Sequence, residues 1–160
     1  MEPLVRTLVD ADIAAVVNMN EFVFRMSGTK KTILKFCSTS NCLGLVVEAE
    51  NQVIAGFLLL EAKERKIVVH RLCVHPDFER RGYAKALILA ASDQMNDRQH
   101  LLVVDVCEIN MQACLLLKSL GMKSQLIRGL YHPLDGVRFY FNNKADDQLT
   151  KDQAPNSPSD

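Results

Sequence analysis

The middle of the chain restricts the fold most, because it predicts a strand, a helix and a second strand in succession. Residues 67–74 form an apolar run typical of a strand, and apolar residues then recur at helical spacing from Gly82 to about Met95. A second apolar run, 101–107, is expected to be a strand buried on both faces. Since a helix that joins two neighbouring strands leaves them parallel, locally parallel pairing is expected here.

Shorter segments on both sides of this region predict antiparallel strands and further helices. Two β-rich runs joined by a polar link, 43–47 and 53–60, are a hairpin candidate. The other expected elements are a strand at 4–9, a helix over 13–24 that Asp10 or Asp12 caps, helices through 33–36 and 110–120, and last strands at 122–130 and 137–141. The expected fold class is therefore α/β with a mixed sheet, antiparallel at the front and locally parallel in the middle, with helices on both faces.

Length and composition predict one domain without a membrane span. The chain has 160 residues and turns polar near its end, so a domain at 1–143 and a disordered tail at 144–160 are expected. No stretch approaches the roughly 18 consecutive apolar residues of a membrane span, and the start does not read as a signal peptide. Lys plus Arg and Asp plus Glu both number 19, which argues against a nucleic-acid partner.

The cysteines and histidines are not spaced like metal ligands or a disulfide framework. The five cysteines are odd in number and contain no Cys-x-x-Cys pair, and the four histidines are scattered. Small buried thiols in a reducing compartment are the simplest interpretation. We therefore expect a cytoplasmic protein without a metal site.

The turn between the central strand and the central helix has the features of an anion site. Its sequence is Val74-His75-Pro76-Asp77-Phe78-Glu79-Arg80-Arg81-Gly82-Tyr83-Ala84. A helix start exposes unpaired backbone N–H groups and the positive end of the helix dipole, which favour a bound anion. Gly82 and Ala84 leave room for a phosphate, and the cations at the same rim are Arg80, Arg81 and Lys85. The prediction is a pyrophosphate cradle, and the alternative is a surface helix whose basic residues are merely solvated.

The same turn resembles the acetyl-CoA-binding signature of the GNAT acetyltransferase superfamily. That signature runs Val-x-Pro, two residues, Arg or Gln, two residues, Gly, any residue, and Gly or Ala. A second stretch is similar to the family's Asn-x-x-Ala…Leu-Gly-Phe helix through Asn110, Ala113, Leu120, Gly121 and Met122, and the resemblance spans roughly residues 4–142. It implies a GNAT-like fold, with a central, mostly antiparallel mixed sheet of six to seven strands, a V-shaped split and about four flanking helices.

The resemblance also implies an N-acetyltransferase, in which an amine attacks the thioester of acetyl-CoA directly while both substrates are bound. The acceptor would be a primary amine of a small amine, an amino acid or a protein. Many members of the family pair as dimers, so the resemblance allows a homodimer, although no sequence feature forces one. A non-catalytic module that binds acyl-CoA as a sensor or docking domain is the alternative.

Two catalytic roles follow from the resemblance. The backbone N–H of Cys73 would face the developing oxyanion. His70, four residues before Val74, would be the general base, because a histidine ordinarily titrates near pH 6.5. A half-exposed strand histidine with a structural role is the alternative, and Glu61 and Glu108 are weaker candidates for the base. The residues expected to bind the coenzyme are Leu72, Cys73, Val74, Arg80, Arg81, Gly82, Tyr83, Ala84, Lys85 and Asn110.

Two residues depart from the family pattern. Glu79 stands where Arg or Gln is usual, and a carboxylate there is expected to weaken coenzyme affinity unless it turns away or pairs with a neighbouring arginine. Leu117 stands where many relatives have a tyrosine that acts as general acid, so that role is vacant or filled elsewhere. Tyr131 is a candidate for it, with packing at a strand end as the alternative.

Selectivity for the acceptor comes, in the family, from the regions that correspond here to 22–36 and 128–138. Neither region holds a dense acidic run that would select a polyamine. The side chains that line an apolar acceptor pocket there, or belong to the core instead, are Met19, Phe22, Phe24 and Met26.

Overall fold

The computed structural model describes residues 2–24 and 29–142 of the chain. The helices are α1 (Ile13–Phe24), α2 (Thr29–Cys37), α3 (Tyr83–Asp93) and α4 (Met111–Ser119). The strands are β1 (Leu4–Thr7), β2 (Cys42–Glu48), β3 (Ile54–Ala62), β4 (Lys66–Val74), β5 (Leu101–Cys107), β6 (Lys123–Tyr131) and β7 (Leu134–Asn142). Each strand and helix expected from the sequence is present. Within the described residues, no helix has the length and apolar character needed to cross a membrane.

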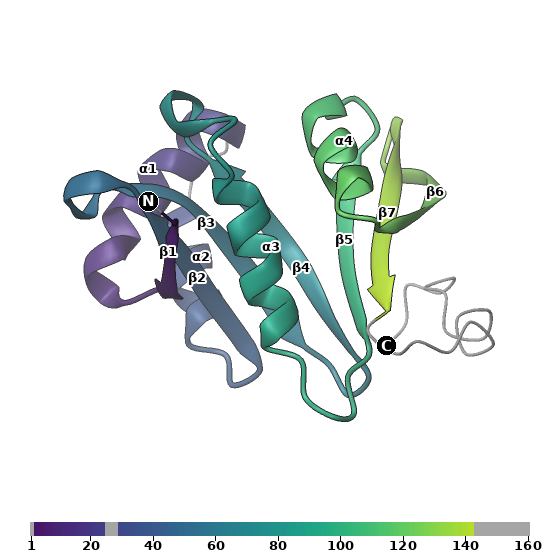
Figure 1. The fold of residues 1–160 in the computed structure, drawn as a ribbon, viewed down its shortest axis with the longest axis horizontal. Helices are drawn as coiled ribbons and strands as arrows, with labels where there is room; N and C mark the ends of the chain where they lie inside the picture. The colour runs from purple at the N-terminus through teal and green to yellow at the C-terminus, as the bar shows by residue number, and fades with distance from the viewer. Residues whose placement is uncertain (1, 25–28, 143–160) are drawn as a thin grey trace. The chain divides into compact units, whose positions relative to one another are not determined.

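The strands are ordered β1-β2-β3-β4-β5-β7-β6 (Figure 1). β4 and β5 pair in parallel through Lys66–Val69 and Leu101–Val104. The pairs β1–β2, β2–β3, β5–β7 and β6–β7 are antiparallel. The expected mixed sheet of six to seven strands with about four helices is confirmed for the described part of the chain, and the V-shaped split stays a prediction.

The chain divides into two compact units. Within the described residues, the first unit comprises 2–24, 29–62 and 70–94, and the second unit comprises 63–69 and 95–142. β4 therefore belongs to both units, with the boundary between Val69 and His70. The single domain expected at 1–143 stays a prediction, and the tail expected at 144–160 lies outside the described residues.

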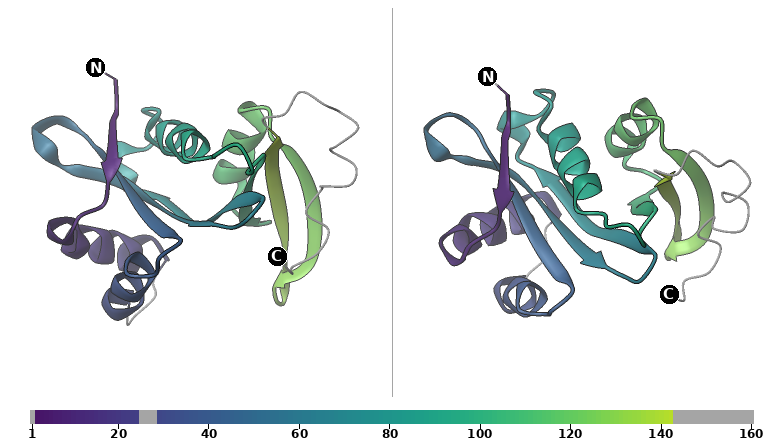
Figure 2. Two further views of the ribbon diagram at one scale, coloured as in Figure 1. Left: turned by 90° about the horizontal axis from the view of Figure 1, so that it is seen from below. Right: turned by 60° about the horizontal axis from the view of Figure 1, so that its bottom comes forward.

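In the first unit, helices cover both faces of the strands (Figure 2). α1 and α2 cover one face, and α3 covers the other with Leu87, Ile88 and Ala91 buried at helical spacing. The core under α1 and α2 consists of Ile13, Val16, Met19, Ile33, Val46, Phe57, Leu59 and Cys73. Because side chains alternate along a strand, β3 presents every second residue to this face, here called the α1/α2 face, and β4 contributes Cys73 to it.

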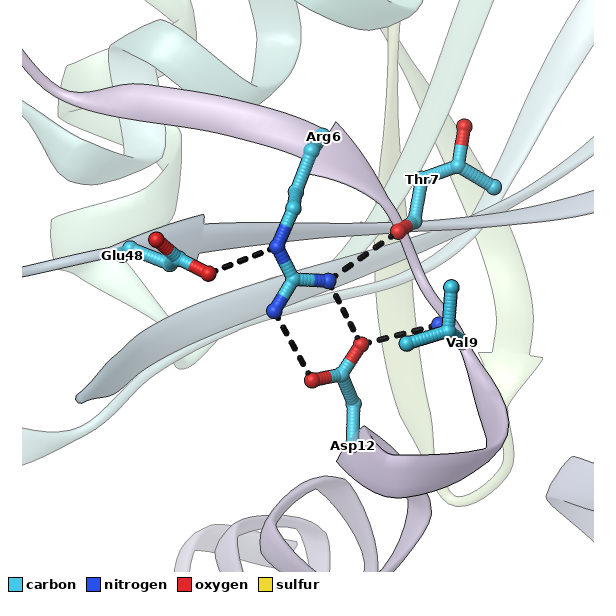
Figure 3. Close-up of polar contacts among 5 residues, drawn as sticks. All are labelled: Arg6, Thr7, Val9, Asp12 and Glu48. Carbon is cyan, nitrogen blue, oxygen red and sulfur yellow. Dashed lines mark hydrogen bonds and ion pairs between the residues drawn. The ribbon is translucent and has the colours of Figure 1, made fainter. Parts of the chain in front are cut away.

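Arg6 ties β1 to β2 and to the turn before α1 (Figure 3). Its Nε donates to Glu48 Oε1 at 2.6 Å, and Nη1 and Nη2 donate to the two carboxylate oxygens of Asp12 at 2.7 and 2.9 Å. Asp12, which is 5% exposed, also accepts a bond from the Val9 N–H at 2.8 Å. The bonds from Arg6 hold the pKa of the Asp12 carboxyl below its usual range. Asp12 thus caps the short turn Asp10–Asp12 that leads into α1.

The second unit is built on β5, β7 and β6. β5 is buried along most of its length, as expected from its apolar sequence. Asp105 interrupts the apolar run, and its carboxylate accepts two bonds from Arg138, its cross-strand partner on β7, at 2.7 and 2.9 Å. β7 begins at Leu134, three residues before the expected start at Val137, because Leu134 pairs with Tyr131 across the hairpin.

Candidate functional site

The backbone turn between β4 and α3 opens the first residues of the helix to solvent. Pro76–Phe78 form a 3-10 turn, and Gly82, the N-cap of α3, has a φ of 85°, which glycine adopts without steric cost. Apart from its chain neighbours, no described atom lies within 4 Å of the place where a Cβ on Gly82 would lie. The N–H groups of the first helical turn, which have no partner inside a helix, therefore begin beside open space.

The cations expected at this turn are exposed: Arg80, Arg81 and Lys85. The guanidinium carbon of Arg81 lies 5.6 Å from the centre of the Phe78 ring, which is a cation–π contact. Glu79 is exposed as well, and Arg81, one of the two arginines with which this carboxylate could pair, contacts the Phe78 ring. Residues 77–85 hold three cations against two carboxylates, so the turn carries a net positive charge.

The part of β4 next to the turn lies close against β3. A Cβ on Gly56 would lie 2.7 Å from the carbonyl oxygen of Cys73, so the absence of a side chain on Gly56 permits this approach. The Cys73 side chain is buried on the α1/α2 face, and burial raises the pKa of its thiol to about 12. The thiol is therefore protonated at neutral pH, which favours the interpretation of Cys73 as a buried hydrophobe rather than a nucleophile.

His70 and Glu61, two separate candidates for the base, lie together. His70 Nε2 is 2.6 Å from Glu61 Oε2, and the side chains are 45% and 28% exposed. The ring of Phe36 on α2 contacts the His70 ring at a centroid distance of 5.7 Å and an interplanar angle of 75°. An ionised carboxylate only accepts hydrogen bonds, so Nε2 carries the proton of this bond and Nδ1 is left to accept another.

β4 is irregular beside His70. Arg71 Nη1 donates to Asn20 Oδ1 on α1 at 2.6 Å, so Arg71 and His70 both contact helices that cover the α1/α2 face. Consecutive residues of a regular strand point to opposite faces, which means that the alternation is interrupted here. The sequence did not reveal Asn20, although a polar residue four positions after Val16 on the buried side of a helix was an available signal.

Two site candidates in the second unit have backbone partners. Asn110 Oδ1 accepts a bond from the Ala113 N–H at 3.2 Å and so caps α4. Glu108 Oε1 accepts a bond from the Asp135 N–H at 3.1 Å. Each of these side-chain oxygens thus has a local structural role within the second unit.

Two other residues of the second unit, Leu117 and Tyr131, were considered for the role of general acid. Leu117 is fully buried in α4, and its aliphatic side chain has no proton to donate. Tyr131 ends β6 and is half-exposed, and burial, followed by the charge of Asp105, raises the pKa of its hydroxyl. The phenol is therefore protonated at neutral pH.

The family model described as "Acetyltransferase (GNAT) family" matches residues 13–122. The [ribosomal protein bS18]-alanine N-acetyltransferase of Haemophilus ducreyi is 27% identical over 137 residues, which cover 84% of this chain and 93% of that protein. The crystal structure of the corresponding Escherichia coli enzyme has a TM-score of 0.77 at 19% identity and covers 92% of this chain and 99% of its own. Arabidopsis thaliana NAA60 in complex with acetyl-CoA has a TM-score of 0.76 at 14% identity, over 88% and 99% of the two chains.

Proposed function

Because this chain belongs to the acetyltransferase (GNAT) family, we propose that it acetylates the α-amino group at the N-terminus of a polypeptide, with acetyl-CoA as donor. The family assigns it to the N-acetyltransferases, as expected from the sequence, and favours the enzyme over the sensor. The identity of the acceptor goes beyond what membership of the family gives. The proposal is carried by the exposed His70–Glu61 pair, and the relative from Haemophilus ducreyi is named for an alanine of a ribosomal protein.

The turn before α3 is proposed to hold the pyrophosphate of the coenzyme. The open space at Gly82 supports this, since a phosphate needs close approach to backbone N–H groups, and Arg80, Arg81 and Lys85 supply positive charge. The N–H groups of Gly82, Tyr83 and Ala84 are the proposed backbone donors. The backbone of Leu72, Cys73 and Val74 is the proposed partner of the pantetheine arm, and Asn110 stays a prediction for the same ligand.

An α-amino group suits the His70–Glu61 pair chemically. Its pKa is ordinarily about 7.7–8.0, whereas that of a lysine side chain is about 10.4. A histidine therefore removes the proton from an α-ammonium group at a much smaller cost than from lysine. This difference favours a polypeptide N-terminus over an internal lysine.

The proposed reaction uses few groups of the protein. His70 Nδ1 accepts the proton of the ammonium group, and Glu61 stabilises the imidazolium through Nε2. The thioester of acetyl-CoA supplies the carbonyl carbon that the amine attacks. The backbone N–H of Cys73 is the proposed donor to the oxyanion. A thiol has a pKa of about 8.5, so the leaving thiolate needs no general acid, which accommodates Leu117.

Replacing His70 by alanine is expected to lower kcat/KM by about 10²- to 10⁴-fold at neutral pH, the usual contribution of a general base. The acidic limb of the pH–rate profile should flatten, and added imidazole should restore part of the rate. Initial rates of CoA release between pH 5.5 and 9 measure both effects.

Glu61→Gln tests the partner of His70, and Glu64→Gln in the exposed β3–β4 turn is the matched control. Glu61→Gln should slow the reaction and change the acidic limb, while Glu64→Gln should behave as the wild type. A His70→Ala enzyme that keeps the shape of the wild-type profile removes His70 as the base.

The acceptor class is tested with one peptide in two forms. A peptide of about ten residues with a free N-terminal alanine and an internal lysine is compared with the same peptide formylated at its N-terminus. CoA release is expected with the free form and only background release with the blocked form. Equal rates with both, or a faster reaction with spermidine, would show that the acceptor is a different amine.

Four further expectations from the sequence stay predictions. These are the cytoplasmic location, the homodimer, the absence of a nucleic-acid partner and the absence of a metal. Within residues 2–24 and 29–142, no three His, Cys, Asp or Glu side chains are grouped so as to hold a metal ion.

A further inference from the structure

β4 contains one residue more than the part of β3 beside it. The two strands are neighbours in the sheet, and a backbone bond of 2.9 Å joins them near each end. Lys63 N–H donates to the carbonyl of Lys66, and His75 N–H donates to the carbonyl of Ala55. The stretches of chain between these two bonds are 56–62 and 67–74. The second stretch is one residue longer, which is the mark of a β-bulge in β4.

The contacts of His70 and Arg71 place the bulge at these two residues, which both belong to the first unit. The His70 ring meets that of Phe36 on α2, and Arg71 donates to Asn20 on α1, so both side chains lie on the α1/α2 face. Cys73, two residues after Arg71, lies on the same face, as regular alternation requires. A regular strand that kept Cys73 and Arg71 in these places would turn His70 to the opposite face. The bulge is therefore what holds the proposed base on the α1/α2 face.

Asn20 is a polar residue on the apolar, buried side of α1. It is fully buried, and the buried apolar residues of the same helix are Ile13, Val16 and Met19. Its Oδ1 accepts the 2.6 Å bond from Arg71 Nη1, whereas its Nδ2 has no hydrogen-bond partner among the described residues. A buried N–H group without a partner lowers the stability of a fold. Since this loss brings no gain in packing, the bond to Arg71 is the feature that accounts for an asparagine at this place.

We propose that Asn20 is a positioning residue for the reaction, because it holds Arg71 and thereby fixes the bulge that presents His70 on the α1/α2 face. The inference rests on the proposed function, in which His70 is the base, and adds to it a residue that is itself buried from both substrates. A general base has to lie within hydrogen-bond reach of the proton that it removes, and a misplacement of about 1 Å costs on the order of 10²-fold in rate. Asn20 therefore acts on the transfer step, through the placement of His70 Nδ1, and leaves coenzyme binding unaffected.

The test begins with Asn20→Leu, which removes the acceptor oxygen and keeps a side chain of similar size. CoA release between pH 5.5 and 9 should show kcat lowered about 10²-fold and a flattened acidic limb, while the KM for acetyl-CoA stays that of the wild type. Asn20→Asp, which keeps an acceptor oxygen for Arg71, should retain most of the activity. Asn18→Leu, the same change at an exposed position of α1, is the matched control and should behave as the wild type.

Combination with His70→Ala separates positioning from a merely structural role. Asn20→Leu should have no further effect in the His70→Ala enzyme, because His70 is the group through which Asn20 acts. Arg71→Met, which removes the donor at the other end of the same bond, should give the same non-additive loss, so the test does not depend on one variant folding. Additive losses in the double variants, or a normal rate in Asn20→Leu, overturn the positioning role and leave the proposed function intact. A normal rate in His70→Ala itself overturns the proposed base, and the positioning role with it.

Discussion

Gly82→Glu is expected to lower the affinity for acetyl-CoA at least a hundredfold. The new carboxylate would enter the open space before α3, where the pyrophosphate is proposed to bind. Two unit charges about 5 Å apart repel by ~3 kcal/mol near a protein surface, which corresponds to more than a hundredfold in affinity. Calorimetric titration of the purified protein with acetyl-CoA measures the loss directly.

Gly121→Glu is the matched control for backbone strain. Gly121 has a φ of 81°, close to the 85° of Gly82, and likewise has open space around its Cβ position, but it follows α4 in the second unit. The same side chain therefore imposes the same left-handed strain at a residue that is not part of the turn. Gly121→Glu should bind acetyl-CoA as the wild type does. Equal losses in both variants, or full affinity in Gly82→Glu, would mean that the pyrophosphate binds elsewhere.

Arg6→Met is expected to lower the free energy of unfolding by about 3 kcal/mol, the lower end for breaking a buried ion pair. Asp12 and Glu48 would both lose their charged partner, and Asp12 is 5% exposed. The lower end applies because a third of the Arg6 side chain is exposed. Urea unfolding of the variant and the wild type measures the difference, with the exposed Arg65→Met as control.

Acid titration separates the loss of this charge pair from a general loss of packing. The pKa of Asp12 is lowered in the folded state, so its contribution to stability is full above the unfolded value of about 3.9. That contribution is lost as the pH falls through the folded value. The wild type should therefore lose more stability between pH 5 and 3 than Arg6→Met, and Arg6→Met with Asp12→Asn should recover part of the loss. Equal acid sensitivity in both proteins would contradict the assignment.

The helices and strands could be predicted from local sequence, because burial imposes a regular spacing of apolar residues on each of them. The helix α3 and the parallel pair β4–β5 could be predicted for this reason. Strand ends could not, since they depend on partners elsewhere. β1 ends at Thr7 rather than at the expected Val9, whose N–H donates to Asp12 instead of extending the strand. The bond from Arg6 to Glu48 joins residues 42 positions apart and left no pattern in the sequence.

In the candidate site, too, residues that form one contiguous stretch could be recognised from the sequence, whereas contacts between separate elements could not. The turn from Val74 to Gly82 is contiguous, so its glycine and cations could be recognised together. His70 and Glu61 were both named, but their pairing depends on how β3 meets β4. Phe22 was named as a pocket candidate and His75 belongs to the contiguous turn, but the stacking of their rings depends on how α1 meets the end of β4 and could not be predicted.

The way β4 is shared between the two units has a consequence for work with fragments. Each unit is assembled from two separate stretches of chain, and the stretches alternate along the sequence. No single cut in the gene releases either unit whole, and a fragment that ends after α2 or begins at β5 lacks part of the unit to which it belongs. A truncation series would therefore report on incomplete cores, and point substitutions are the appropriate way to dissect this protein.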